Sequence, residues 1–142
     1  MKFIPLMNII NHIVQMKKSQ SPTESEMEIL QILWQNGSCT VREVNEILSE
    51  NKEVGYTTTL KIMQIMADKA IVLRDTSSRT HIYTAAIDQE KTQNSMLNTF
   101  ISKTFGGSAS SLVLQALGNH QTNDTELQEI KELIEKIENS QK

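Results

Sequence analysis

The sequence is poor in several residue types that define common classes of protein. Its 142 residues include one cysteine, two prolines and six aromatic side chains other than histidine. A single cysteine excludes a disulfide framework and a cysteine-based metal cluster, and it is typical of a reducing compartment. No apolar run approaches the roughly 20 residues that a membrane-spanning helix needs. We therefore expect a small cytoplasmic protein.

An excess of positive charge is also missing. The net charge is −3, which at first argues against a nucleic-acid partner. The charges are unevenly distributed, however. Residues 21–53 hold two basic and seven acidic side chains, whereas residues 54–86 hold four basic and two acidic ones. A surface for a polyanion is therefore expected within residues 54–86.

Residues 1–20 differ from the rest of the chain. They contain three lysines, no acidic residue and no cleavage site of the A-x-A type, so a secretory signal is not expected. Met16 is followed by two lysines, as at a natural translation start. We interpret residues 1–20 as an N-terminal extension that is either disordered or the product of a mis-assigned start.

Residues 21–86 have the pattern of a winged helix-turn-helix. Capping boxes at Thr23-x-x-Glu26 and Thr40-x-x-Glu43 predict two helix starts, and Gly55 precedes a third helix. The predicted helices span residues 24–35, 40–50 and 57–69, and a predicted β-hairpin follows at residues 71–75 and 79–85. This order predicts a mostly α fold with a small β-hairpin, in which the hairpin is the wing.

The third helix has one polar face and one apolar face at about 100° per residue. A polar face of this kind either contacts a DNA groove or is simply solvated. Threonines at a helix start suit phosphate or base edges, and lysine and glutamine reach guanine and adenine edges. The arginines near the wing suit the DNA backbone. The candidate DNA-binding residues are Thr57, Thr58, Lys61, Gln64, Arg74 and Arg79.

Residues 87–142 are predicted to be a helical dimerisation domain. Three apolar helices follow one another here, and the last has the 3-4-3 spacing of a helix that packs on another helix. Helices this apolar need a partner surface, and a second copy is the simplest one. The candidate dimerisation residues are Met96, Leu97, Phe100, Ile101, Leu112, Val113, Leu127, Ile130, Ile134 and Ile137.

Catalytic and metal-binding motifs are absent from the sequence. The three histidines are too scattered for ligand spacing, and there is no nucleophile elbow or phosphate loop. We expect no enzyme activity, no metal and no cofactor. Trp34 and Cys39 are interpreted as core residues rather than as a ligand-stacking ring or a redox switch. Tyr83 either approaches a phosphate or packs the wing on the core.

Several segments in order resemble the penicillinase repressor family. The residues 26–34, E-M-E-I-L-Q-I-L-W, are similar to the opening of that family's first helix. The threonine-rich start at residues 56–61 is similar to its recognition-helix entry, and Arg79-x-x-x-Tyr83 is similar to its second wing strand. Residues 105–108, F-G-G-S, are similar to its dimerisation region. The resemblance covers about residues 22–140.

This resemblance implies a homodimeric transcriptional repressor that binds palindromic operators in double-stranded DNA. It also implies release by proteolysis, with a membrane metalloprotease sensor as a partner. Copper-responsive members have a C-terminal cysteine cluster, which this chain lacks after Cys39. Ala70 replaces the family's usual glycine, so either it is strained or the turn before the wing is built differently. The alternative function is a winged-helix module that binds protein and not DNA.

Overall fold

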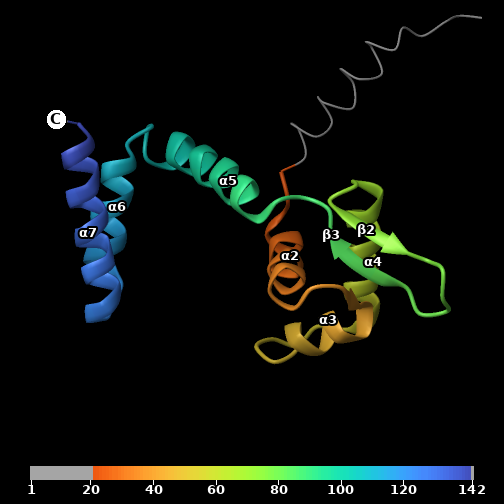
Figure 1. The fold of residues 1–142 in the computed structure, drawn as a ribbon. Helices are drawn as coiled ribbons and strands as arrows, with labels where there is room; N and C mark the ends of the chain where they lie inside the picture. Colours follow the sequence, from red (N-terminus) through yellow and green to blue (C-terminus); the bar gives the residue numbers. More distant parts are fainter. Residues whose placement is uncertain (1–20, 142) are drawn as a thin grey trace, which may run out of the picture. The chain divides into compact units, whose positions relative to one another are not determined.

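The computed structural model describes residues 21–141, so the predictions for residues 1–20 lie outside the described residues (Figure 1). Within residues 21–141, no helix is both long and apolar enough to span a membrane. The helices are α2 (Glu24–Asn36), α3 (Val41–Leu48), α4 (Tyr56–Asp68), α5 (Gln89–Thr104), α6 (Ala109–Asn119) and α7 (Asp124–Ser140). The strands are β1 (Cys39–Thr40), β2 (Val72–Asp75) and β3 (Ile82–Ala85).

The order from α2 to β3 is that of a winged helix, which confirms the predicted fold class. The hairpin of β2 and β3 belongs to a three-stranded antiparallel sheet with the order β1-β3-β2. The third strand, β1, was missing from the prediction. It contains two residues that pair with Tyr83 and Ile82 of β3, and two residues are too few to show the alternation that identifies a strand.

Side-chain caps set the starts of the first helices. The Thr23 hydroxyl accepts the Glu26 N–H at 3.2 Å, and the Glu26 carboxylate accepts the Thr23 N–H at 3.0 Å. This is the complete capping box that the sequence predicts. Thr40 caps α3 through its hydroxyl, which accepts the Glu43 N–H at 3.2 Å. Gly37 ends α2 with a φ of 78°, a conformation that glycine adopts without a steric cost.

One core joins the helices α2, α3 and α4 to the sheet. Tyr83 is 1% exposed, so it packs the wing on the core. Cys39 is also buried, and burial raises the pKa of its thiol, as expected for an inert core residue. Trp34 is half-buried, and its indole N–H donates to the carbonyl of Ile87 at 3.1 Å. The core residues also include Ile29, Leu30, Leu33, Val44, Met63, Met66 and Val72.

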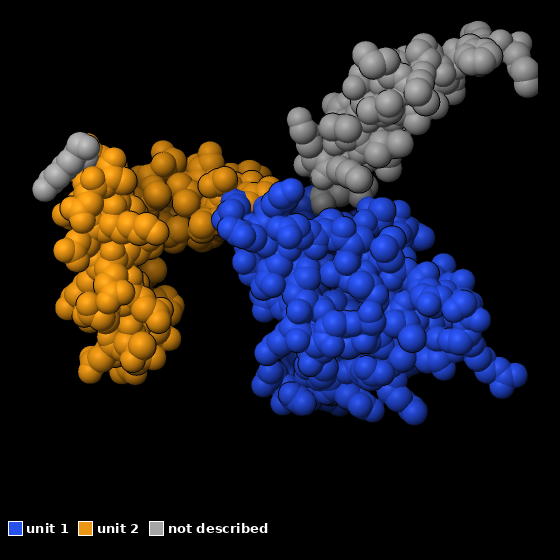
Figure 2. Space-filling model, in the orientation of Figure 1, with its two compact units in different colours: residues 1–94 blue, residues 95–142 orange. Residues whose placement is uncertain are grey.

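The chain divides into two compact units, and the division falls between Asn94 and Ser95 within α5 (Figure 2). In the C-terminal unit, Gly106 and Gly107 have positive φ angles and separate α5 from α6. Gly118 lies within α6, which continues to Asn119. None of the described side chains of α5, α6 and α7 is buried, although many of them are apolar.

Ala70 joins α4 to the wing in a left-handed conformation. Its φ is 62°, and it is the one residue other than glycine with a positive φ among residues 21–141. The turn is therefore not built differently to suit alanine. The wing that follows is nevertheless intact, since Val72 pairs with Ala85 and the Ala86 N–H donates to the Ile71 carbonyl at 2.9 Å. A left-handed alanine costs about 1 kcal/mol relative to glycine.

We expect Ala70→Gly to raise the free energy of unfolding by about 0.5–1 kcal/mol, because glycine adopts this backbone conformation without a Cβ clash. Urea unfolding of the variant and the wild type measures the change. Gly37→Ala is the control in the opposite direction and should lower the free energy of unfolding. An added Cβ meets no atom within 4 Å at this position, so only the positive φ would destabilise the folded state. An unchanged or lower stability of Ala70→Gly would mean that the left-handed alanine stores no strain.

Candidate nucleic-acid interface

The start of α4 is fixed against α3 by a partly buried polar network. Asn45 of α3 donates from its amide nitrogen to the carbonyl of Val54 at 3.0 Å and to the hydroxyl of Thr59 at 2.9 Å. Thr59 is completely buried. A partly buried amide and a buried hydroxyl that satisfy one another favour a single arrangement of the two helices. The turn of the helix-turn-helix is therefore set by hydrogen bonds as well as by apolar packing.

The two faces of α4 divide as the sequence predicts. Thr59, Met63 and Met66 are buried on the inner face. The exposed side chains on the opposite face form a polar stripe of Thr57, Lys61, Gln64 and Asp68. A helix that exposes such a polar stripe can enter a DNA major groove, where lysine and glutamine can form hydrogen bonds with base edges.

A hollow of about 270 Å³ lies beside this stripe, between α3, α4 and the wing. We call it the arginine hollow, because Arg42, Arg74 and Arg79 all line it. None of its lining residues, all within the described part of the chain, is acidic. Three arginines without an acidic residue in the lining favour an anion with several oxygens, such as a phosphate. The other lining residues are Thr40, Val41, Tyr56, Leu60, Gln64, Thr80, His81 and Tyr83.

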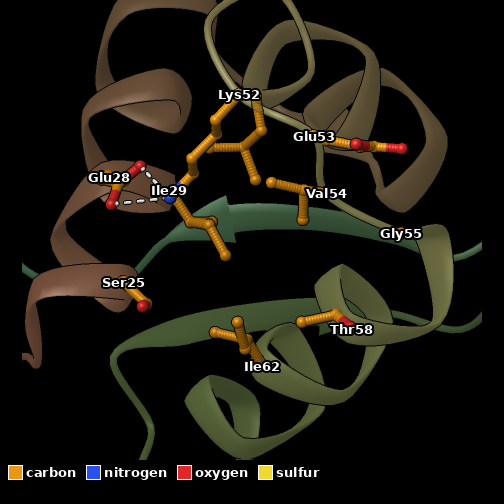
Figure 3. Close-up of a pocket in the computed structure, with 10 residues that line it drawn as sticks. Ser25, Glu28, Ile29, Lys52, Glu53, Val54, Gly55, Thr58 and Ile62 are labelled. Atoms are coloured by element: carbon orange, nitrogen blue, oxygen red, sulfur yellow. Dashed lines mark hydrogen bonds and ion pairs between the residues drawn. The ribbon is translucent and has the colours of Figure 1, made fainter.

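The structure brings only part of the predicted site into this hollow. Gln64, Arg74 and Arg79 line it, whereas Thr57 and Lys61 lie on the exposed stripe next to it. Thr58 lies apart and lines a second hollow between α2, α4 and the turn before α4 (Figure 3). The roles of all six residues in DNA binding stay predictions.

The second hollow has a different charge. Figure 3 shows Lys52 paired with Glu28, and the Lys52 nitrogen lies 2.7 Å from a carboxylate oxygen of Glu28. Glu53 adds a second carboxylate to the lining. The hollow that contains Thr58 is therefore less suited to a phosphate than the arginine hollow is.

Arg42, Tyr56 and His81 line the arginine hollow but were missing from the predicted site. Arg42 was missed because it belongs to the acidic segment 21–53, and a count along the chain does not show that it folds next to the wing. A usable signal was present, since the Thr40 cap places Arg42 in the first turn of α3. The N–H groups of a first turn add positive potential, which strengthens the attraction for an anion.

The wing tip is shaped by short hydrogen bonds. The Asp75 carboxylate accepts the Ser77 N–H at 2.9 Å, and the Ser78 hydroxyl donates to the Thr80 carbonyl at 2.8 Å. Hydrogen bonds from Ser77 lower the pKa of Asp75, so this carboxylate is charged at neutral pH. Asp75 is not among the residues that line the arginine hollow.

Comparison with known proteins shows the family. Residues 22–136 match the sequence model of the family described as penicillinase repressor. The chain belongs to this family. It is 26% identical over 113 residues to the penicillinase repressor of Staphylococcus aureus, which covers 80% of this chain and 90% of that protein. It is 24% identical over 127 residues to the penicillinase repressor of Bacillus licheniformis, in an alignment that covers 89% of this chain and 99% of that protein.

A solved structure, the solution structure of the DNA-binding domain of the repressor BlaI, also aligns with the chain. The TM-score is 0.45 and the identity is 22%, over 49% of this chain and 88% of that domain. The family match confirms the resemblance from the sequence, and it places the chain among transcriptional repressors, a class that does not consist of enzymes.

We expect Lys61→Ala and Arg42→Ala to weaken DNA binding in different ways. Lys61→Ala should reduce the free energy of binding to the specific site by about 1–3 kcal/mol, because a base contact would be lost. The loss on unrelated DNA should be much smaller. Arg42→Ala and Arg79→Ala should weaken both, because a phosphate contact is independent of sequence. Fluorescence anisotropy on both DNAs measures the difference.

Lys52→Ala is the matched control, since it removes one positive charge from the hollow of Figure 3 and should change neither affinity appreciably. An equal loss from Lys61→Ala on both DNAs would make that residue a phosphate contact.

Proposed function

We propose that the chain is a homodimeric transcriptional repressor of the penicillinase-repressor type, which acts in the cytoplasm on palindromic operators. In this proposal α4 enters the major groove, and the arginine hollow lies along the flanking phosphates. The observation that carries the proposal is the arginine hollow itself. Three arginines from α3, β2 and the wing loop line one space beside the polar stripe of α4.

The charge of the hollow favours DNA over the alternative of a protein partner. A phosphate chain presents regularly spaced anions, and arginine binds them bidentately. A protein-binding helix would more often present a broad apolar surface, but the exposed stripe of α4 holds threonine, lysine, glutamine and aspartate. The positive surface covers only a small part of an acidic chain. Several contacts between basic side chains and phosphates are therefore needed for tight binding to DNA.

A dimer supplies that multiplicity. The apolar residues of α5, α6 and α7 are left at least partly exposed, and Leu114 is 74% exposed, Leu133 56% and Phe100 49%. Exposed apolar side chains in this number favour burial against another surface. A second copy would bury them and bring two α4 helices onto one DNA site. Such half-sites lie about one turn of DNA, or a multiple of it, apart.

Release follows from the same arrangement. A single winged helix with a few phosphate contacts binds weakly, and two linked ones bind much more tightly. Cleavage within the C-terminal region by a membrane metalloprotease sensor would therefore lower operator affinity without touching the DNA interface. This part of the proposal rests on the family resemblance.

Salt titration tests the DNA-binding part of the proposal. We expect the affinity for a palindromic fragment from the protein's own promoter to fall about 10³-fold between 50 and 200 mM salt, because about three phosphate contacts per subunit release counterions. Filter binding or anisotropy at several salt concentrations measures the slope. Absence of salt-sensitive binding at low ionic strength would contradict the proposal and favour a protein partner.

A double substitution tests the dimer. Ile130→Glu with Ile134→Glu should give a monomer that loses operator binding, because two carboxylates cannot be buried in an apolar seam without a large cost. Sedimentation velocity measures the association. The control, Gln128→Glu with Asn139→Glu, adds the same charge on the opposite face of α7 and should leave the dimer intact. A test variant that stays dimeric would place the interface elsewhere.

A further inference from the structure

The end of α4 is held by an ion pair that is separate from the DNA interface. The Lys69 nitrogen donates to both carboxylate oxygens of Glu26, at 2.9 and 3.2 Å. The same Glu26 carboxylate accepts the Thr23 N–H at 3.0 Å. The Glu26 residue is 2% exposed. One buried carboxylate therefore caps α2 and ties the first turn of α2 to the end of α4.

This ion pair lies where the two DNA-contacting elements meet. Lys69 is the residue that caps the C-terminus of α4, and the left-handed Ala70 comes next. The strand β2 begins at Val72 and contains Arg74. A change in the conformation of Lys69 or Ala70 would change the angle between α4 and the wing.

The energy of the pair does not by itself explain its presence. Burial raises the pKa of Glu26, but the hydrogen bond from Lys69, the hydrogen bonds from Thr23 and the charge of Lys69 bring this pKa below its ordinary value of 4.5. The Glu26 carboxylate is therefore charged at neutral pH. Because desolvation offsets much of the attraction, replacing a buried pair by uncharged residues of similar size often leaves stability unchanged. Its directional bonds nevertheless define one geometry.

We propose that Glu26 and Lys69 are positioning residues, which hold the joint between α4 and the wing at the angle that lets both contact one DNA duplex. This inference rests on the proposed function. Neither residue is placed to contact DNA itself. Glu26 is buried, and Lys69, the residue that caps the C-terminus of α4, has its nitrogen bonded to Glu26.

The test uses the full-length double variant Glu26→Gln with Lys69→Met. Glutamine keeps an oxygen for the Thr23 N–H, so the cap of α2 is retained, and methionine keeps the volume of the lysine stem. The variant loses one charge of each sign, so its net charge is unchanged. Thermal unfolding verifies that it is folded at the assay temperature, and affinity is then measured on operator and on unrelated DNA.

The matched control is Glu28→Gln with Lys52→Met. It removes an ion pair of the same two residue types from the same domain, one whose side chains are 47% and 40% exposed. A third variant, Lys69→Arg, keeps the charge and its donors, and it should bind operator like the wild type.

We expect the test variant to bind operator about tenfold more weakly, while its affinity for unrelated DNA is unchanged. The control variant should bind both DNAs with the affinity of the wild type. Hydrogen exchange should also rise at residues 67–75 in the absence of DNA. Wild-type-like operator binding by the folded test variant would overturn the inference alone. An equal loss on both DNAs would also overturn it, because Lys69 would then be a phosphate contact. Failure of the wild type to bind DNA would instead refute the proposed function, and this inference with it.

Discussion

The packing of α4 on α2 and α3 is the constraint on which the rest of the structure depends. Met63 and Met66 are fully buried, so the rotation of α4 about its axis is set by the core and the polar stripe is turned outward. Polar contacts then fix both ends: Asn45 at the start of α4 and Glu26 at its end. Apolar burial supplies the driving force, while directional bonds select one orientation.

Charge in this protein is a local property and not a property of the whole chain. The net charge is −3, yet three arginines line one hollow without an acidic neighbour in the lining. At physiological salt, interactions beyond about 8 Å are largely screened at the surface. An anion at the hollow therefore responds mainly to the nearby guanidinium groups. A mildly acidic average is compatible with a polyanion partner when the basic side chains converge.

Much of the fold could be predicted because its signals are short in range. The Thr23–Glu26 capping box and the amphipathic pattern of α4 each depend on neighbours a few residues away. The two-residue strand β1 could not be predicted, since it exists only through pairing with β3. For the same reason Arg42 was assigned to an acidic segment, although its side chain lines the arginine hollow.

The sequence by itself determined the order of the helices and of the β2–β3 hairpin, the two faces of α4 and the apolar character of α5 to α7. These follow from periodicity and capping, which act between residues close in the chain. Only the tertiary structure decided which charges meet: Arg42 with Arg74 and Arg79, and Glu26 with Lys69, 43 positions apart. Such pairs depend on how the helices pack, and this packing cannot be derived from the spacing of residues along the chain.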